Sequence, residues 1–217
     1  MTLDLFAGPG HAALSQLPLA PGAMLLRGFA VPEEAVLFAG LQEVLGQAPF
    51  RHMVTPGGLR MSVAMTNCGA LGWVSDRAGY RYDAVDPTSG RHWPDMPALF
   101  LALARRAAAR AGFEGFNPDA CLVNRYAPGS KLSLHQDRDE RDFTAPIVSV
   151  SLGLPATFLF GGLRRADKAL RVPLQHGDVV VWGGPARLRY HGVLPLQPGS
   201  HLLAGEHRIN LTFRKAG

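Results

Sequence analysis

The stretch His207-Arg208-Ile209-Asn210-Leu211-Thr212-Phe213-Arg214 decides the fold, because apolar and polar side chains alternate along it without a break from Arg208 onwards. Successive side chains of a β-strand point to opposite faces, so Ile209, Leu211 and Phe213 share one face, which is typical of packing against a core. The opposite face is polar. It either meets water, as in a half-buried surface strand, or lines a cavity in which arginines hold an anion. The strand taken alone favours the surface interpretation.

Short strands separated by turns fill the rest of the C-terminal half. We expect them at 119–127, 146–153, 156–160, 178–183, 187–192 and 207–214, after shorter ones at 24–29 and 61–67. Two helices are predicted before them, over 32–46 and 97–111. No helix-forming segment separates the C-terminal strands, which disfavours a parallel βαβ fold. The pattern predicts an α+β protein whose sheet part is a sandwich or a jelly roll.

We expect the whole chain, 1–217, to form one domain with three distinct parts. Residues 1–22 are rich in Gly, Pro and Ala and predict a loosely ordered arm. Residues 51–93 combine Gly, Met and aromatic residues with a single clear strand, and we interpret them as a loop-rich lid. The strand-rich part, 119–214, is the expected core.

The composition is typical of a soluble globular protein, with 217 residues of which 47% are hydrophobic and 18% charged. It excludes a disordered tail protein. No apolar run is long enough to span a bilayer, and the first residues lack the basic start of a secretory signal, so we expect no membrane association. Cys68 and Cys121 have no metal-type spacing and are interpreted as buried free thiols in a reducing cytoplasm.

Positive charge is concentrated towards the C-terminus. The net charge is +5, and residues 151–217 carry nine Lys or Arg against three acids, whereas residues 1–50 carry one Arg against four acids. Most of the basic residues are arginines, whose forked guanidinium binds phosphate and carboxylate groups. Such a surface suits nucleic acid or an acidic small molecule, although it can also serve only to keep a protein soluble.

Three side chains in the strand-rich half have the chemistry of metal ligands. His135 and Asp137 are two residues apart, so in an extended backbone they point the same way. This spacing is common by chance. However, three expected strands separate Asp137 from His191, and this separation allows the strand that carries His191 to fold back beside the segment that carries His135. Two histidines and one aspartate on a β scaffold form the ligand set of mononuclear non-haem Fe(II) oxygenases. The other histidines, among them His176 and His201, fall in expected turns and loops and are interpreted as surface or hydrogen-bonded side chains.

The strand at 119–127 carries two further polar residues on one face, Asn124 and Tyr126. Both side chains can donate hydrogen bonds to carboxylate oxygens. A strand buried in a core rarely has two such residues on the same face. Together with Arg208 and Arg214 of the last strand, they are consistent with a cavity that binds an anion.

These residues follow one another in an order that is known from a protein family. The chain resembles the AlkB family of Fe(II)- and 2-oxoglutarate-dependent dioxygenases, which repair alkylated nucleic-acid bases. The resemblance runs from Leu3 to Arg214, and its most specific part is the Arg-x-Asn-x-Thr-x-Arg pattern of the last strand. The other matching stretches are residues 53–58, 61–69, 124–129 and 132–137.

The resemblance implies a double-stranded β-helix, the cupin-like jelly roll, with two flanking N-terminal helices and a nucleotide-recognition lid. It implies Fe(II), 2-oxoglutarate and O₂, with the metal held by His135, Asp137 and His191. Arg208 is expected to pair with the distal carboxylate of 2-oxoglutarate, and the implied remainder of that pocket is Asn124, Tyr126, Asn210, Thr212 and Arg214. The implied substrate contacts are Trp73, Tyr80, Arg81, Tyr82, Asp139 and Arg165.

The function implied by the resemblance is oxidative demethylation of alkylated bases, of the 1-methyladenine and 3-methylcytosine type, with release of formaldehyde, succinate and CO₂. The expected substrate is single- or double-stranded DNA, with RNA as a further candidate, and the expected enzyme is a monomer. A methylated base must leave the base stack to be reached. Trp73 offers an aromatic face that attracts a cationic base, and the alternative for Trp73 is an ordinary core residue.

Three other functions remain open at this stage. The same cofactors could act on RNA only, or on a protein side chain. A non-catalytic, basic nucleic-acid-binding module could use a degenerate shell of the same fold, but it predicts lost metal ligands and none of the three is lost. A zinc hydrolase could also use two histidines and an aspartate, but it would not need two arginines on one strand face.

Overall fold

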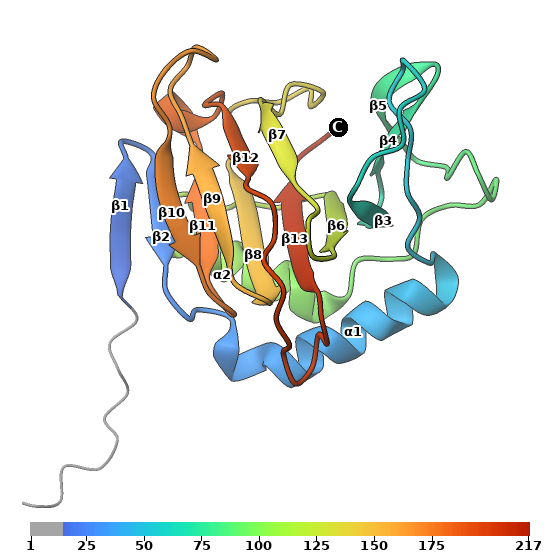
Figure 1. Ribbon diagram of the computed structural model, residues 1–217, viewed down its shortest axis with the longest axis horizontal. Helices are drawn as coiled ribbons and strands as arrows, with labels where there is room; N and C mark the ends of the chain where they lie inside the picture. The colour runs from blue at the N-terminus through green and yellow to red at the C-terminus, as the bar shows by residue number, and fades with distance from the viewer. Residues whose placement is uncertain (1–14) are drawn as a thin grey trace, which may run out of the picture.

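The computed structural model describes residues 15–217, and its strands form two antiparallel sheets and a separate hairpin (Figure 1). The large sheet has the order β1-β2-β11-β8-β13-β6-β3 and the small sheet the order β10-β9-β12-β7. The large sheet consists of Gln16–Ala20 (β1), Ala23–Leu26 (β2), Ala64–Gly69 (β3), Ala120–Tyr126 (β6), Ile147–Gly153 (β8), Val179–Trp182 (β11) and Arg208–Arg214 (β13). The small sheet consists of Leu132–His135 (β7), Ala156–Phe160 (β9), Leu170–Leu174 (β10) and His191–Val193 (β12).

The two sheets pack face to face through a shared apolar cluster. Trp182 and Tyr126 of the large sheet lie in one cluster with Phe158 and Phe160 of the small sheet. The ring centroids of Phe158 and Trp182 are 6.0 Å apart. Two antiparallel sheets joined in this way confirm the expected jelly roll.

Two helices cover the other face of the large sheet, as expected. They are Glu34–Gln47 (α1) and Ala98–Arg110 (α2), and short 3-10 turns lie at Val31–Glu33 (η1) and Gly184–Ala186 (η2). The buried side of α1 carries Leu37, Leu41 and Val44, which recur at helical spacing. They belong to a cluster that also contains the apolar face of β13.

Strand β13 lies in the interior of the large sheet, paired with β6 on one side and β8 on the other. Its apolar face packs beneath the helices. Its polar face is also buried, with Arg208 1% exposed and Arg214 7% exposed. The surface interpretation of this strand is therefore wrong, and its polar side chains line the space between the sheets.

Outside the lid segment, the structure differs from the expectations in four strands, and three of these strands contain or follow a proline. Strand β1 forms within the expected arm, whose residues 1–14 lie outside the described part of the chain. Strands β1 and β10 contain Pro18 and Pro173, and both are edge strands, where a missing backbone N–H is tolerated. Strand β7 follows the turn at Pro128 and is only four residues long. The strand expected at 187–192 is reduced to β12, which begins at His191.

The lid segment contains a β-hairpin that we did not expect, formed by Gly72–Asp76 (β4) and Gly79–Asp83 (β5). Gly79 adopts φ +125°, which suits glycine and marks the tight turn. At Gly72 any Cβ would collide with the ring of Trp93, so glycine allows the hairpin to approach the core. The segment is thus more regular than a loop-rich lid.

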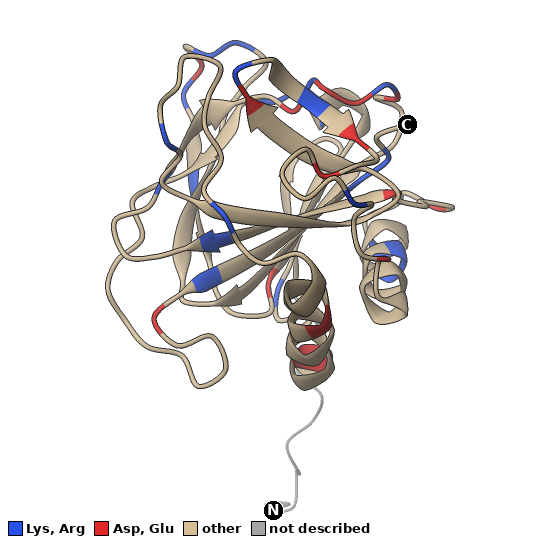
Figure 2. Cartoon of the chain, turned by 90° about the vertical axis from the view of Figure 1, so that its right-hand side faces the viewer, with Lys and Arg blue, Asp and Glu red and all other residues tan. Residues whose placement is uncertain are grey.

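Basic and acidic residues are interspersed along the loops and the hairpin in the cartoon of Figure 2. Among residues 15–217, no helix has the length and apolar character needed to cross a membrane.

Candidate active site

A cavity of about 580 Å³ opens between the two sheets and beneath the β4–β5 hairpin. It brings together most of the residues that the sequence singled out, from both sheets, the hairpin and the loops that follow β7 and β9. The expected residues that line it are Trp73, Tyr80, Tyr82, Asn124, Tyr126, His135, Asp137, Asp139, Arg165, His191, Arg208, Asn210, Thr212 and Arg214.

Three side chains converge in this cavity with metal-ligand geometry. His135 ends β7 and His191 begins β12, and the two residues are direct cross-strand partners. The Nε2 atom of His135 lies 3.5 Å from Oδ1 of Asp137, and the Nε2 atom of His191 lies 3.7 Å from Oδ2. The three ligand atoms all lie within 4.8 Å of one another. Asp137 lies in the loop just beyond β7, which ends at His135. Its side chain points to the same centre as that of His135, as predicted from the spacing.

Both imidazoles are held with Nε2 facing the centre of the group. The Nδ1 atom of His135 lies 2.9 Å from the carbonyl oxygen of Ser133, and the Nδ1 atom of His191 lies 3.0 Å from that of Arg189. A carbonyl only accepts hydrogen bonds, so each Nδ1 carries the proton and donates it. The Nε2 lone pairs are therefore free for a cation, as in metal sites whose histidines are oriented by backbone carbonyls.

The charges of the group also suit a cation. Burial alone would raise the pKa of Asp137, but Arg214 and the two histidines outweigh burial and hold this pKa well below its usual value. Burial and the neighbouring His135 lower the pKa of His191 to about 4, so its imidazole is neutral near pH 7. Burial opposes protonation of His135 as well, but the carboxylate of Asp137 raises the pKa of this histidine overall. An ionised carboxylate beside a neutral imidazole is a suitable ligand set for a divalent cation.

Elsewhere in the cavity Arg208 presents a buried guanidinium with too few partners. Its Nη2 atom donates to Oγ of Ser151 at 3.0 Å, and its carbon Cζ lies 5.0 Å from the centre of the Tyr126 ring. Its Nε and Nη1 atoms are buried and have no hydrogen-bond partner among the described residues. Burial lowers the pKa of Arg208, as expected for a cation without a counter-ion. A carboxylate accepts two parallel hydrogen bonds from such a guanidinium, so this part of the cavity fits the carboxylate of an oxo acid.

A network of neutral polar side chains surrounds Asn210. Its Nδ2 atom donates to Oγ of Ser149 at 2.8 Å, and its Oδ1 atom accepts from Thr212 at 2.9 Å and from Asn124 at 3.3 Å. Ser149 and Ser151 were not among the residues predicted from the sequence. Their signal was the Ser-x-Ser spacing in β8, which places two hydroxyls on one face of an otherwise apolar strand.

Arg214 lines the cavity, as the resemblance implies, and its part in the cosubstrate pocket stays a prediction. Its Nε and Nη2 atoms also donate to Oδ2 of Asp137 at 2.9 and 2.6 Å. Burial disfavours the charge, but Asp137, with smaller contributions from Tyr82 and Glu140, raises the pKa of Arg214 above its ordinary value. Because Arg214 occupies Oδ2, the Oδ1 atom of Asp137 remains available to a cation.

The β4–β5 hairpin turns its aromatic face towards the cavity. The rings of Trp73 and Tyr80 are stacked, with centroids 5.7 Å apart and planes 13° from parallel. The Nε1 atom of Trp73 donates to Oδ2 of Asp139 at 2.7 Å, and the ring is only partly buried. Arg81 does not line the cavity. It lies on the opposite face of the hairpin, where it donates to both carboxylate oxygens of Asp76 at 3.0 Å, and its contact with the substrate stays a prediction.

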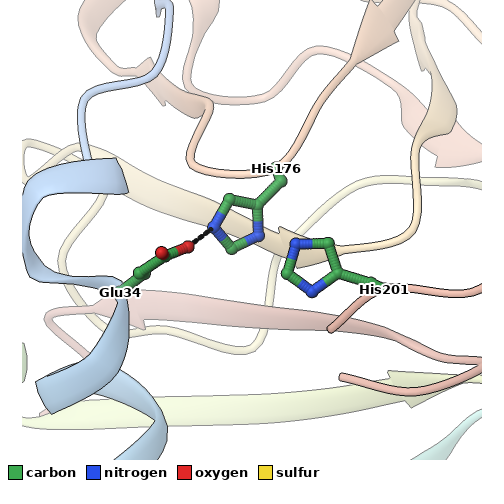
Figure 3. Close-up of side chains that lie close together, drawn as sticks. All are labelled: Glu34, His176 and His201. Atoms are coloured by element: carbon green, nitrogen blue, oxygen red, sulfur yellow. Dashed lines mark ion pairs between the residues drawn. The ribbon is translucent and has the colours of Figure 1, made fainter. Parts of the chain in front are cut away.

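A second group with metal-type residues, Glu34, His176 and His201, lies away from the cavity (Figure 3). The rings of the two histidines are stacked with centroids 4.3 Å apart, and Nε2 of His176 lies 2.6 Å from Oε2 of Glu34. The Nδ1 atom of His176 accepts the backbone N–H of Gly153 at 2.9 Å. A neutral His176 therefore carries its proton on Nε2, where a metal would need the lone pair. This geometry favours a hydrogen-bonded contact between α1 and two loops, in agreement with the interpretation of these histidines from the sequence.

This jelly roll brings together in one cavity two histidines, an aspartate and a buried arginine that has no counter-ion within residues 15–217. That combination defines a mononuclear non-haem iron oxygenase of the type that binds an oxo acid. Comparison with known proteins agrees. Residues 22–214 match the family model of the 2OG-Fe(II) oxygenase superfamily.

Three individual proteins illustrate the similarity. The chain is 59% identical over 214 residues to the alpha-ketoglutarate-dependent dioxygenase AlkB of Salmonella typhimurium, covering 99% of this chain and 98% of that protein. It is 31% identical over 223 residues to the DNA N(6)-methyladenine demethylase ALKBH1D of Arabidopsis thaliana, covering 89% of this chain and 49% of the plant protein. The solved structure of OsALKBH1 superposes with a TM-score of 0.79 at 30% identity, covering 93% of this chain and all of that one.

The chain belongs to the AlkB family and is a dioxygenase that depends on Fe(II), 2-oxoglutarate and O₂.

Proposed function

We propose that this protein removes methyl groups from alkylated nucleic-acid bases, of the 1-methyladenine and 3-methylcytosine type, and so reverses alkylation damage directly. The observation that carries the proposal is one cavity in which a cation site, an anion site and an aromatic hairpin meet. Iron(II), 2-oxoglutarate and O₂, when bound, supply the oxidation of the N-methyl carbon, with formaldehyde, succinate and CO₂ as products.

The protein's part in this chemistry begins with holding the cofactors. We assign the metal to His135, Asp137 and His191, because their free lone pairs converge and the carboxylate is ionised. We assign the distal carboxylate of 2-oxoglutarate to Arg208, because two of its buried nitrogens have no hydrogen-bond partner in the described part of the chain. The other residues that we assign to the cosubstrate pocket are Asn124, Tyr126, Asn210, Thr212 and Arg214.

The hairpin has features that suit a flipped-out base. Trp73 is only partly buried and presents a face to the cavity, and Tyr80 beside it is 48% exposed. Stacking on aromatic side chains is the usual way to hold an extruded base, and a positively charged methylated base is attracted further by the π face. The carboxylate of Asp139 and the guanidinium of Arg165 lie at the same mouth of the cavity. The name of the plant relative, a DNA N(6)-methyladenine demethylase, supports nucleic acid as the substrate class.

We further infer that the enzyme acts as a monomer in the cytoplasm. One chain supplies the cation site, the anion site and the hairpin, so a second copy is not needed to complete the cavity. Size-exclusion chromatography with light scattering measures the mass directly. A mass of one chain is expected, and a stable dimer would contradict this part of the proposal.

The experiment that tests the function measures formaldehyde released from matched oligonucleotides. The panel contains 1-methyladenine or 3-methylcytosine in single-stranded DNA, double-stranded DNA and RNA, with unmethylated strands and a methylated protein peptide as controls. We expect release from the methylated nucleic acids only, and only when Fe(II) and 2-oxoglutarate are both added. Release from the peptide alone, or from no methylated strand, would overturn the proposal.

A further inference from the structure

The loop that carries Asp137 also carries a buried carboxylate to which the proposed chemistry assigns no role. Glu140 is 6% exposed, and three side chains from three different elements surround it. Its Oε1 atom accepts the hydroxyl of Tyr82 at 2.9 Å and lies 3.2 Å from Nε of Arg214. Its Oε2 atom lies 3.2 Å from Nη2 of Arg187. Glu140 is thus a point of contact between the hairpin, the end of β13 and the segment before β12.

Four charges form a closed group around this point. Arg214 lies between two carboxylates, because it binds Oδ2 of Asp137 as well as Glu140. Arg187 is 3% exposed and also donates to the backbone oxygen of Asp137 at 3.1 Å. Two carboxylates and two guanidinium groups balance one another, which is how buried charges are tolerated. Removing the charge of Glu140 would leave two arginines for the single carboxylate of Asp137.

The hairpin reaches this group through its inner face. Trp73 and Tyr82 are cross-strand partners, so their side chains point the same way. Trp73 donates to Asp139 at 2.7 Å and Tyr82 donates to Glu140 at 2.9 Å. The two hydrogen bonds fall on consecutive residues of the loop, two and three positions beyond Asp137. A displacement of the hairpin would therefore act directly on the loop that carries the metal-type carboxylate.

We propose that Glu140 is a positioning residue that couples the β4–β5 hairpin to Asp137 through Arg214. The hydrogen bond from Tyr82 fixes Glu140, Glu140 fixes Arg214, and Arg214 holds Oδ2 of Asp137 so that Oδ1 faces the cation. Seating a base on the hairpin and orienting the carboxylate then become linked events. The coupling to a base rests on the proposed function, whereas the action of Glu140 on Asp137 does not.

The first test measures the affinity for Co(II) without any nucleic acid, in the wild type and in Glu140→Gln. Glutamine has nearly the same shape but no charge, so both arginines are drawn to Asp137 and a net positive charge remains beside the cation site. We expect Co(II) to bind at least about fivefold more weakly, with an altered Co(II) absorption spectrum. Wild-type affinity and spectrum in Glu140→Gln would overturn the role of Glu140.

The second test measures whether an oligonucleotide with 1-methyladenine changes the Co(II) affinity, in the wild type and in Tyr82→Phe. Phenylalanine keeps the ring and removes only the hydroxyl that binds Glu140. Because linkage is reciprocal, a base that helps to orient Asp137 must tighten Co(II), by about threefold or more in the wild type. We expect the ratio of the Co(II) affinities with and without the oligonucleotide to fall to about one in Tyr82→Phe. This variant also keeps the proposal testable if Glu140→Gln does not fold.

The matched control is Asp76→Asn, which removes the ion pair with Arg81 on the outer face of the same hairpin. It should retain the wild-type ratio. A ratio of one in the wild type, an unchanged ratio in Tyr82→Phe, or an equal loss in Asp76→Asn would each overturn the coupling. Failure of every variant to bind the methylated oligonucleotide would contradict the proposed function instead, and the Co(II) affinity of Glu140→Gln would still decide the role of Glu140.

Discussion

Arg208 is the side chain whose surroundings say most about the ligand, because a buried cation is stable only with a partner. Ser151 satisfies one nitrogen and the ring of Tyr126 faces the guanidinium, but two nitrogens remain without a partner among the described residues. The sequence placed Arg208 on the correct strand face. It could not show that this face is buried, since the same alternation occurs in surface strands and only the position of β13 between β6 and β8 decides it.

Replacing Arg208 by methionine should separate ligand binding from stability. Loss of charge-assisted hydrogen bonds should weaken 2-oxoglutarate binding by roughly 10- to 100-fold. Stability should stay the same or rise, because an apolar side chain replaces an unpaired buried charge. Titration calorimetry and thermal unfolding measure the two effects.

The control for this variant is Arg187→Met, which removes an equally buried arginine whose charge is paired with Glu140. It should lower the unfolding temperature by roughly 5–10 °C. If Arg208→Met destabilises the protein as strongly as this control, Arg208 has a structural partner and the anion site is misassigned.

The metal site makes an equally direct prediction. His135→Ala, Asp137→Ala and His191→Ala should each abolish Co(II) binding and lower turnover by more than about 100-fold, because three ligands are needed to hold the cation. Treating the wild type with a chelator should have the same effect, and added Fe(II) should reverse it. His176→Ala serves as the control and should bind Co(II) normally, since its group lies outside the cavity. Normal binding in a ligand variant would remove that residue from the metal site.

At the level of elements, the hairpin is the part that distinguishes this oxygenase cavity from a bare jelly roll. Among residues 15–217, strands β4 and β5 pair with each other and join neither of the larger sheets. Ser75 donates to the backbone oxygen of Val54 at 2.6 Å, and the backbone of Trp73 is tied to the side chain of Asn67. These contacts hold the hairpin against the rest of the chain, while the ring of Trp73 stays only partly buried at the cavity.

Replacing Trp73 by alanine should therefore affect the substrate and not the cosubstrate. Loss of one stacking surface should weaken binding of a methylated oligonucleotide by about 1–3 kcal/mol, which corresponds to roughly 5- to 150-fold. The affinity for 2-oxoglutarate should change less than about twofold, because the side chains of Arg208 and Asn210 are untouched. Fluorescence anisotropy and calorimetry measure the two affinities. Equal losses in both, or an unfolded variant, would show that Trp73 is a core residue.

The helices and the longer strands could be predicted from the sequence because their patterns are local. The apolar residues of α1 recur at helical spacing, and β13 alternates throughout. The hairpin could not be predicted, because the pairing of Trp73 with Tyr82 depends on the turn between the two strands. Strands β1 and β10 are interrupted by prolines, which edge positions tolerate but a sequence pattern does not reveal. The partnership of Arg214 with Asp137 joins residues 77 positions apart and depends on the finished fold.

On the scale of the whole molecule, the jelly roll brings distant residues together by sheet pairing. Antiparallel pairing of β7 and β12 places His135 opposite His191, and the pairing of β13 with β6 and β8 brings the polar side chains into the same interior. The helices close the outer face, so the space between the sheets remains for ligands. The protein's net charge of +5 attracts a polyanion such as nucleic acid.

Binding of oligonucleotides should weaken as salt is raised, because phosphate contacts release counterions. A plot of the logarithm of affinity against the logarithm of salt concentration should be linear with a negative slope. In Arg165→Ala, which loses a charge at the cavity mouth, the slope should be smaller by about 0.7–0.9 if that arginine meets a phosphate. An affinity independent of salt would contradict a nucleic-acid substrate held by its backbone.

The central claim is that the cation site, the anion site and the aromatic hairpin serve one reaction, and the ratio of its products tests this most directly. We would measure formaldehyde and succinate together while the enzyme repairs DNA that contains 1-methyladenine, with unmethylated DNA as the control. Our account predicts one formaldehyde and one succinate for each methyl group removed, and only slow succinate formation on the unmethylated strand. Succinate formed equally fast on both strands, with no formaldehyde from the methylated one, would contradict it.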